Sequence, residues 1–240
     1  MEIHVITAFP AIFESPLNEC ILKLGQKKKL VDIFIHDLRD HTTDKHRQVD
    51  DYPYGGGPGM ILKPEPFFAS IDFIREKHRI ESPKIIFLTP QGKRFTQQKA
   101  IELAKEEYLI ILCGHYKGID ERIRDVLVDE EISIGDYVLS GGEIPALVIM
   151  DSIVRLIPGV MNDLDSAITD SFHMALLDGP YYTRPKIFEG YEVPDILLSG
   201  DHAKIAEWRK QKAIERTQQR RSDLLERMDQ VSTHSNADKS

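Results

Sequence analysis

Residues 133–143 read SIGDYVLSGGE, a stretch that passes from a short apolar segment through paired glycines into an apolar run. Ile132 and Ile134 alternate with polar neighbours, as in a strand. Pro145 fits the first turn of a following helix. Glycine allows a positive φ or a close approach to a ligand, and three glycines occur here: Gly135, Gly141 and Gly142. The stretch predicts a strand, a loop and a helix, and the loop is either a ligand site or a tight connection alone.

The same strand-and-helix alternation extends through the first half of the chain. Strands are expected at residues 3–9, 31–38, 84–88, 109–113 and 131–134. Helices are expected at residues 10–29, 64–78, 96–107, 120–128 and 144–156. Short apolar strands separated by helices indicate an α/β fold with a mainly parallel sheet flanked by helices.

Composition narrows the class of protein. The 240 residues are 41% hydrophobic and 29% charged, as in ordinary globular proteins. No apolar run approaches the length of a membrane span, and the first residues do not resemble a signal peptide. Two cysteines without paired spacing fit neither a disulfide framework nor a zinc site. These features predict a cytoplasmic protein without a membrane partner.

Charge is segregated along the chain, although the net charge is −8. Residues 201–221 carry seven basic and three acidic side chains, whereas residues 119–136 carry seven acidic and two basic ones. The basic segment is either a solvated helix face or a surface for an anionic partner. Residues 39–60 and 160–173 are long polar connections, which are usually functional or disordered.

Further motifs follow in order: VDDYPYGGGPGM at 49–60, LTPQG at 88–92, CGHYKGIDER at 113–122, DSIVR at 151–155, YTRP at 182–185 and LLSG at 197–200. Together with residues 133–143, they resemble the bacterial tRNA (guanine-N1)-methyltransferases of the SPOUT superfamily. The resemblance covers residues 9–221. Several long motifs in one order are far more specific than any one of them.

The resemblance implies an architecture that periodicity does not. It implies a knotted methyltransferase domain at 1–159 with a deep C-terminal trefoil knot, a flexible linker at 160–175, and a small helical tRNA-binding domain at 176–240. Ordinary topology rules disfavour knots, so the resemblance alone carries this expectation. It also implies a homodimer whose active site lies at the interface, with the linker ordering over the partner subunit.

The resemblance also implies S-adenosylmethionine as the cofactor, bound by three loops that each follow an expected strand. Open α/β sheets bind ligands beyond the carboxyl ends of their strands. For Gly114, a purely structural turn is the alternative. The implied cofactor-binding residues are Leu88, Thr89, Pro90, Gly114, Ile134, Gly135, Asp136, Tyr137, Val138, Leu139, Gly141 and Gly142.

The implied reaction is methyl transfer to N1 of guanosine 37, next to the anticodon of tRNA. That nitrogen holds a proton, so a base must remove it while charge builds on the neighbouring carbonyl oxygen. Asp170 matches the general base of the family, and Arg155 matches the residue that stabilises the oxyanion. Read alone, Asp170 could cap a helix and Arg155 could form a salt bridge. The implied tRNA contacts are Asp50, Ser166, Arg184 and Arg209.

One position departs from the family pattern. Lys117 stands where well-known members carry a glutamate, which inverts a charge beside a cofactor loop. Enzymes of the family usually need magnesium, but this sequence shows no metal-ligand spacing, so magnesium is left open. Two alternatives also remain: another knotted RNA methyltransferase with a different target, and a non-catalytic RNA-binding relative, which Lys117 favours.

Overall fold

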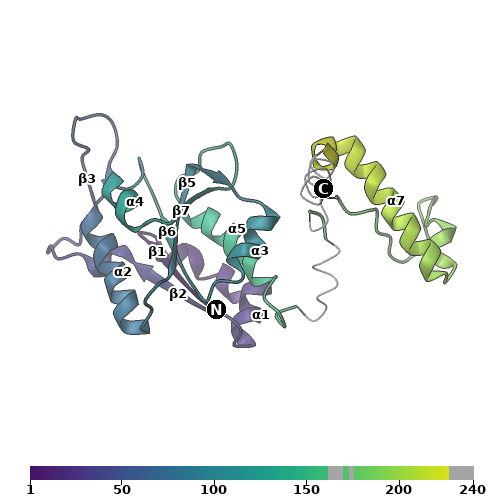
Figure 1. Cartoon of the computed structure of the whole chain (residues 1–240), viewed down its shortest axis with the longest axis horizontal. Helices are drawn as coiled ribbons and strands as arrows, with labels where there is room; N and C mark the ends of the chain where they lie inside the picture. Colours follow the sequence, from purple (N-terminus) through teal and green to yellow (C-terminus); the bar gives the residue numbers. More distant parts are fainter. Residues whose placement is uncertain (162–169, 173–175, 227–240) are drawn as a thin grey trace, which may run out of the picture. The chain divides into compact units, whose positions relative to one another are not determined.

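The computed structural model describes residues 1–161, 170–172 and 176–226. The chain divides into two compact units, Met1–Asn162 and Asp163–Ser240, and each is described by itself (Figure 1). In the part of the chain that is described, no helix is long and apolar enough to cross a membrane.

The first unit contains a five-stranded sheet in the order β2-β1-β6-β5-β7, in which all neighbouring strands are parallel. The expected α/β class and the mainly parallel sheet flanked by helices are therefore confirmed. The strands are β1 (Glu2–Thr7), β2 (Asp32–Asp37), β5 (Lys84–Arg94), β6 (Tyr108–Cys113) and β7 (Glu130–Ser133).

Each face of the sheet is covered by its own helices (Figure 1). On β1, Ile3 and Val5 belong to the buried cluster that includes side chains of α1 (Cys20–Lys27), α3 (Gln97–Leu103) and α5 (Glu143–Val154). Ile6 belongs to the opposite cluster, with α2 (Pro64–His78) and α4 (Glu121–Leu127). Successive strand residues point to opposite faces, so strands buried on both sides show continuous apolar runs.

The largest differences from the sequence-based prediction concern two elements, a helix and a strand. The helix expected at 10–29 is instead two 3-10 turns, η1 (Pro10–Phe13) and η2 (Pro16–Asn18), followed by α1. Pro16 has no N–H and cannot continue a helix begun at Pro10. The strand expected to end at Leu88 extends to Arg94, because residues beyond a bulge pair again with β7.

Short elements complete the first unit. The 3-10 turn η3 (Leu38–His41) follows β2, and β3 (Asp50–Asp51) pairs antiparallel with β4 (Ile61–Leu62). The glycine-rich residues 55–59 lie between these two strands. Gly55, Gly56 and Gly57 all have positive φ, and a Cβ there would meet no atom within 4 Å. These glycines therefore serve the backbone conformation rather than close packing.

The second unit is built around α7 (His202–Arg220), the helix expected from the basic segment. A small hairpin of β8 (Ile187–Phe188) and β9 (Tyr191–Glu192) and the 3-10 turn η4 (Asp195–Leu198) precede it. Residues 176–180 are tied to α7, because the Leu177 N–H donates to Thr217 Oγ1 at 2.9 Å and Arg216 Nη1 donates to the Asp178 and Gly179 carbonyls. Residues 222–226 are helical.

Candidate active site

The three loops expected to hold the cofactor meet at the carboxyl ends of β5, β6 and β7, which are neighbours in the sheet. The Gly142 N–H donates to the Gly114 carbonyl at 2.8 Å, and His115 forms an antiparallel bridge with Gly141. The Phe95 N–H donates to the Ser133 carbonyl at 2.7 Å, which joins the end of β5 to the end of β7. Leu88, at the bulge of β5, pairs with Cys113 and Ile132 in the sheet, so residues 88–91, 113–118 and 133–142 form one cluster, called here the loop junction.

The paired glycines allow the loop junction to close. A Cβ at Gly142 would lie 2.8 Å from Cys113 Cα and 3.1 Å from the Gly114 nitrogen. A Cβ at Gly141 would lie 2.5 Å from a ring carbon of His115 and 2.3 Å from a carboxylate oxygen of Glu143. These glycines thus bring two loops of the protein together, whereas only Gly135 of the three has a positive φ.

The middle of the third loop is open to solvent. Tyr137, Val138 and Leu139 have exposed fractions of 54%, 83% and 40%, and they form an apolar surface next to the junction. Asp136 forms an exposed ion pair with Arg94. The backbone of the turn is held by Ser133, whose hydroxyl donates to the Gly135 carbonyl at 3.0 Å and accepts from the Gly135 N–H at 3.2 Å. This region could receive a flat, partly apolar ligand such as adenine.

A buried polar contact lies beneath the junction, and the sequence did not reveal it. Thr7 Oγ1 donates to Glu143 Oε1 at 2.7 Å, and both residues are buried. Thr7 is the last residue of β1, and Glu143 is the first residue of α5, so the bond ties a strand end to a helix start. A carboxylate is stabilised in the first turn of a helix. Burial, with the nearby Glu143 charge, raises the pKa of the Cys113 thiol.

His115 is a second feature missed by sequence reasoning. Its ring lies between Phe9 and Tyr116, with centroid distances of 4.4 Å and 4.7 Å. Its Nδ1 is buried without a hydrogen-bond partner in the structure. His115 belongs to the CGHYKG motif, but the neighbouring sequence does not distinguish a histidine packed in the protein from one that faces a ligand.

The loop containing Asp50 lies against the loop junction. The Lys117 N–H donates to the Met60 carbonyl at 3.1 Å, and the Leu62 N–H donates to the Gly118 carbonyl at 3.1 Å. Burial, followed by the charge and hydrogen bond of Asp50, raises the pKa of Tyr116. The structure thus brings a residue expected to contact tRNA next to residues expected to bind the cofactor.

The two residues expected to perform the chemistry belong to different units. Arg155 lies half-buried at the C-terminal end of α5, and its N–H donates to the Asp151 carbonyl at 3.3 Å. Asp170 is half-buried in the second unit, close to Asp178. Burial raises the pKa of Asp178, and the charge of Asp170 raises it further. Ser166 lies outside the described residues.

Comparison with known proteins agrees with this geometry. A family model described as tRNA (Guanine-1)-methyltransferase TrmD matches residues 1–227. The chain belongs to this family. It is 53% identical over 228 residues to the tRNA (guanine-N(1)-)-methyltransferase of Anoxybacillus flavithermus, with 94% of this chain and 92% of the relative covered. The proteins of the same name from Bacillus cereus and Bacillus anthracis are 52% identical over 227 residues, with the same coverage.

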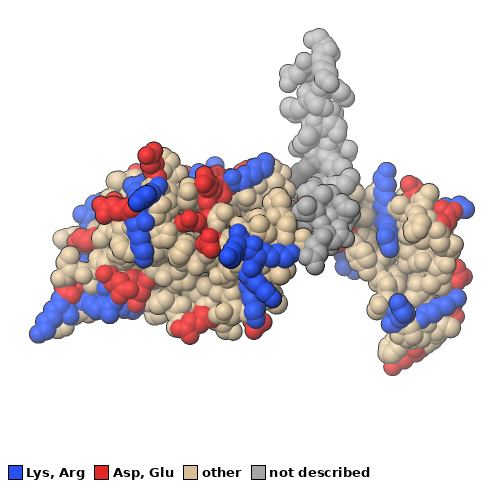
Figure 2. Space-filling view, turned by 90° about the horizontal axis from the view of Figure 1, so that it is seen from below, with Lys and Arg blue, Asp and Glu red and all other residues tan. Residues whose placement is uncertain are grey.

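The remaining residues expected to contact tRNA are exposed in the second unit. Arg184 lies in the segment before β8, and Arg209 lies on α7. On the face shown in Figure 2, the basic side chains of this unit lie among acidic ones. Three of the basic residues of the 201–221 segment form ion pairs: Lys204 with Asp201 at 3.0 Å, Lys212 with Glu215 at 2.7 Å and Arg221 with Asp223 at 2.8 Å. The helix is therefore basic overall, but its positive charge is locally offset.

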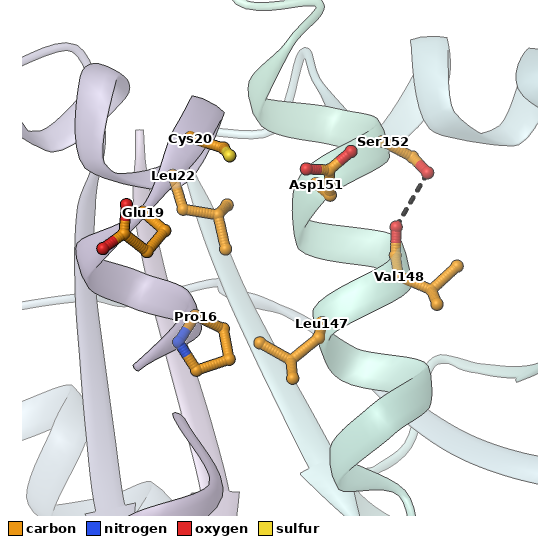
Figure 3. A pocket seen from close by; sticks show the side chains of 8 residues that line it. All are labelled: Pro16, Glu19, Cys20, Leu22, Leu147, Val148, Asp151 and Ser152. Carbon is orange, nitrogen blue, oxygen red and sulfur yellow. Dashed lines mark hydrogen bonds between the residues drawn. The ribbon is translucent and has the colours of Figure 1, made fainter. Parts of the chain in front are cut away.

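A separate groove of about 480 Å³ lies between the η2–α1 segment and α5 (Figure 3). Leu22 and Leu147 supply part of its apolar lining. The carboxylates of the lining are Glu19, from the η2–α1 segment, and Asp151, from α5. Its lining includes none of the residues expected to bind the cofactor. The groove and the loop junction are thus two different features of the first unit of this tRNA (guanine-1)-methyltransferase family member.

Proposed function

We propose that this chain transfers the methyl group of S-adenosylmethionine to N1 of guanosine 37 in tRNA. Family membership over nearly the whole chain supports tRNA guanine methylation. The observation that carries the cofactor assignment is the loop junction, in which residues 113–118 and 133–142 are joined by a backbone hydrogen bond and residues 88–91 lie on the adjacent strand. This edge is where open α/β sheets bind ligands.

The residues at the junction fit S-adenosylmethionine. The exposed apolar surface of Tyr137, Val138 and Leu139 suits the adenine ring, and the backbone of residues 134–139 supplies donors and acceptors for its edge. Leu88, Thr89 and Pro90 lie on the adjoining part of β5. Gly114 lies where the second and third loops of the junction meet. When bound, the cofactor supplies a methyl group activated by its sulfonium.

The chemistry on the guanine side rests on Asp170 and Arg155. Asp170 accepts the N1 proton as the nitrogen attacks, so that N1 gains the methyl group and loses its hydrogen. Arg155 stabilises the negative charge that develops on the neighbouring carbonyl oxygen. Asp50, Ser166, Arg184 and Arg209 contact the tRNA, with single-stranded anticodon-loop bases as the natural targets for stacking and hydrogen bonding.

The active enzyme is proposed to be a homodimer in which Asp170 of one chain serves the loop junction of the other. The groove beside α5 supports this arrangement, because Ile144 and Val148 on the same helix have exposed fractions of 51% and 42%. Apolar side chains on one helix face are typical of a surface that is covered in an assembly. The proposed location is the cytoplasm, where two cysteines without paired spacing are expected to stay reduced. The trefoil knot and the domain limits stay predictions.

The function is tested with labelled S-adenosylmethionine and unmodified tRNA transcripts. A transcript with guanosine 37 preceded by guanosine should gain one methyl group, mapped to 1-methylguanosine, and the same transcript with adenosine at 37 should gain none. Methylation of both transcripts would assign a different target, and methylation of neither would favour a non-catalytic relative. Adding EDTA and then restoring Mg²⁺ in the same assay tests the magnesium requirement.

The dimer is tested by mixing two inactive variants, Asp170→Ala and Gly141→Val. If the base acts across the interface, exchanged heterodimers contain one intact site and recover part of the activity. Proven subunit exchange without recovery would place the base within its own subunit.

A further inference from the structure

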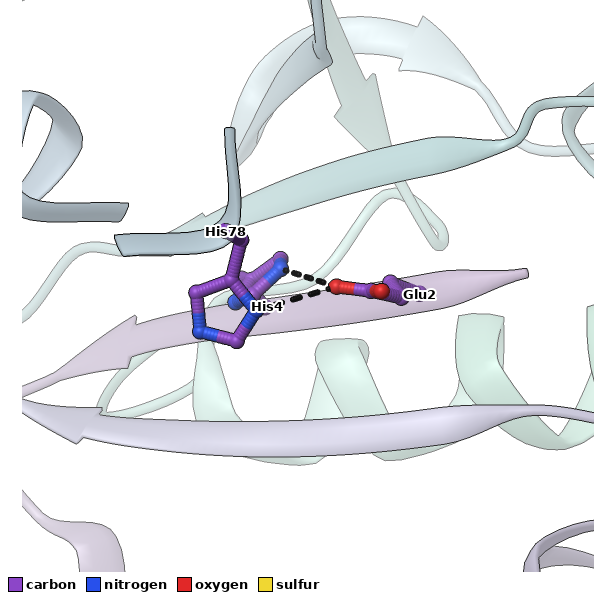
Figure 4. Close-up of side chains that lie close together, drawn as sticks. All are labelled: Glu2, His4 and His78. Carbon is purple, nitrogen blue, oxygen red and sulfur yellow. Dashed lines mark hydrogen bonds and ion pairs between the residues drawn. The ribbon is translucent and has the colours of Figure 1, made fainter. Parts of the chain in front are cut away.

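A cluster of metal-ligating side chains lies away from the loop junction (Figure 4). Glu2 and His4 project from β1, and His78 is the last residue of α2. His78 Nδ1 lies 3.1 Å from Glu2 Oε2, and His4 Nε2 lies 3.5 Å from the same oxygen. One ligand atom from each residue lies within 4.8 Å of the other two. The cluster thus brings together residues from the two ends of the segment 2–78.

The buried member of the cluster has an unsatisfied nitrogen. His4 is fully buried, and its Nε2 has no hydrogen-bond partner. The other ring nitrogen, Nδ1, lies 3.0 Å from His36 Nε2, so one of these two nitrogens donates to the other. If His4 donates, its Nε2 carries a lone pair that faces the Glu2 carboxylate. The lone pair of His4 Nε2 and the Glu2 carboxylate oxygen repel each other, and a cation between them would stabilise both.

The opposite tautomer does not satisfy the site either. If His36 donates to His4, then His4 Nε2 carries the hydrogen and points toward Glu2. The separation of 3.5 Å is longer than the usual 2.7–3.2 Å of an N–H···O bond. The protein alone therefore leaves Nε2 of His4 poorly paired in both tautomers.

The spacing fits a first-row transition metal. Zinc–nitrogen bonds of about 2.0–2.1 Å in a tetrahedron place neighbouring ligand atoms about 3.3 Å apart. The two contacts to Glu2, at 3.1 Å and 3.5 Å, bracket this value.

The surroundings supply the other parts of a metal site. A ligating histidine usually donates its second N–H to a neighbour that fixes its tautomer, and His36 is placed to accept that bond from His4. Phe34 stacks on His4 at 5.0 Å and contacts His78 at 4.6 Å, which holds both rings. Glu2 and His78 have side-chain exposures of 31% and 13%, so an ion can enter from that side.

We propose that Glu2, His4 and His78 bind one divalent transition-metal ion, with Zn²⁺ as the probe. Two imidazoles favour zinc, cobalt or nickel over magnesium, which prefers oxygen ligands. The ion ties the amino end of β1 to the carboxyl end of α2. Glu2 and Thr7 are separated by about 16 Å along β1, and Thr7 contacts the start of α5, so the ion is structural rather than catalytic. The site does not depend on the proposed methyltransferase function.

The test uses the full chain, treated with EDTA and dialysed, and titrated with Zn²⁺ by calorimetry. The wild type should bind one equivalent at this site. Glu2→Gln and His78→Gln should each weaken that binding by more than about 100-fold, beyond the 10–100-fold that the loss of an outer neighbour costs. His202→Gln, an exposed histidine on α7, is the matched control and should bind like the wild type. Circular dichroism checks that every variant is folded.

Replacing Zn²⁺ by Co²⁺ gives a readout of geometry, because a four-coordinate cobalt site shows visible d–d bands that His78→Gln should remove. His36→Leu should weaken zinc binding about 10–100-fold, whereas His36→Gln retains an acceptor and should bind more tightly than His36→Leu.

At 100 times the dissociation constant, zinc should raise the melting temperature of the wild type by roughly 5–10 °C. Methyl transfer, assayed with Mg²⁺ present, should survive the removal of zinc. Folded wild type that takes up no zinc, or unchanged uptake by both Glu2→Gln and His78→Gln, would overturn the proposal.

Discussion

The two units of the chain differ in how they use their apolar side chains. In Met1–Asn162, both faces of the parallel sheet are covered, and two large clusters of buried side chains form the core. Among the described residues of the second unit, only Thr217 and Leu224 are buried. The first unit therefore has a hydrophobic core of its own, whereas most side chains described in the second unit lie at its surface.

The apolar side chains of the second unit point outward. Every residue from 181 to 192 is exposed, and aromatic residues are prominent among them. Exposed aromatic rings are suited to stacking on unpaired RNA bases or to contact with another chain. The largest exposed apolar side chains of this unit are Phe172, Tyr181, Tyr182, Ile187, Phe188, Tyr191 and Leu198.

The largest effect should come from a paired test of the two units. Phe67→Ala removes a fully buried side chain of the first unit and should lower the free energy of unfolding by about 3–5 kcal/mol. Phe188→Ala removes a ring with an exposed fraction of 62% and should change it by less than about 0.5 kcal/mol. Urea unfolding followed by circular dichroism measures both.

Trp208 makes the comparison sharper, because it is the single tryptophan of the chain and lies on α7. Its fluorescence reports the second unit directly. Phe67→Ala should shift the circular dichroism transition more than the fluorescence transition. Equal shifts for both probes would mean that the two units unfold together.

The next largest effect is expected on the rate of methyl transfer, when Asp170 of the second unit is replaced. Asp170→Asn preserves size and hydrogen bonding but removes basicity, so single-turnover methyl transfer should fall at least ~10²-fold. Cofactor affinity should stay near the wild-type value, because the loop junction belongs to the first unit. Near-normal transfer would exclude Asp170 as the base and leave another group or water as the proton acceptor.

Arg155→Ala tests the partner of Asp170 from the first unit. It should raise the barrier by roughly 2–4 kcal/mol if the guanidinium stabilises the oxyanion. The double variant should lose less than the sum of the single variants, because both groups act in one transition state. Strict additivity in single-turnover rates would argue that the two residues act independently.

Local sequence patterns predicted an element well where a residue such as proline favours its first turn. The helix at 64–78 was predicted with its observed bounds, since Pro64 begins it and Arg79 follows in the left-handed conformation. The pairing of residues beyond Leu88 with β7 could not be seen, because it depends on a distant strand. The Thr7–Glu143 bond spans 136 residues, and the His78–Glu2 contact spans 76. Such contacts follow from topology, which periodicity does not encode.

The expected roles of the site residues came from the family resemblance rather than from local physical patterns. Loop positions from 88 to 142 come together because parallel strands end at one edge, a rule that can be applied to sequence. The role of the paired glycines was only partly predicted: they allow two loops to pack together. The roles of Asp170 and Arg155 rest on family membership and stay predictions.

A smaller effect is expected from closing the space at the loop junction. In Gly142→Ala, the new methyl group would lie 2.8 Å from Cys113 Cα, a backbone atom that cannot rotate away. Overpacking of this kind costs about 1–3 kcal/mol and should weaken S-adenosylmethionine binding measured by calorimetry. Ser140→Ala, two residues earlier and exposed, is the control and should bind normally. Equal affinities in the two variants would show that the junction does not form the cofactor site.

The smallest effect should come from the residue that departs from the family pattern. Lys117 is exposed, its stem packs near Gly59, and its N–H bond to Met60 does not involve the side chain. Lys117→Glu should therefore change cofactor affinity by less than about fivefold, the range of exposed charge interactions, and added salt should reduce the difference. Calorimetry at low and high salt measures this, and transfer rates with and without Mg²⁺ test whether the carboxylate increases a magnesium requirement. A salt-independent change of more than tenfold would place the ammonium group of Lys117 in contact with the cofactor.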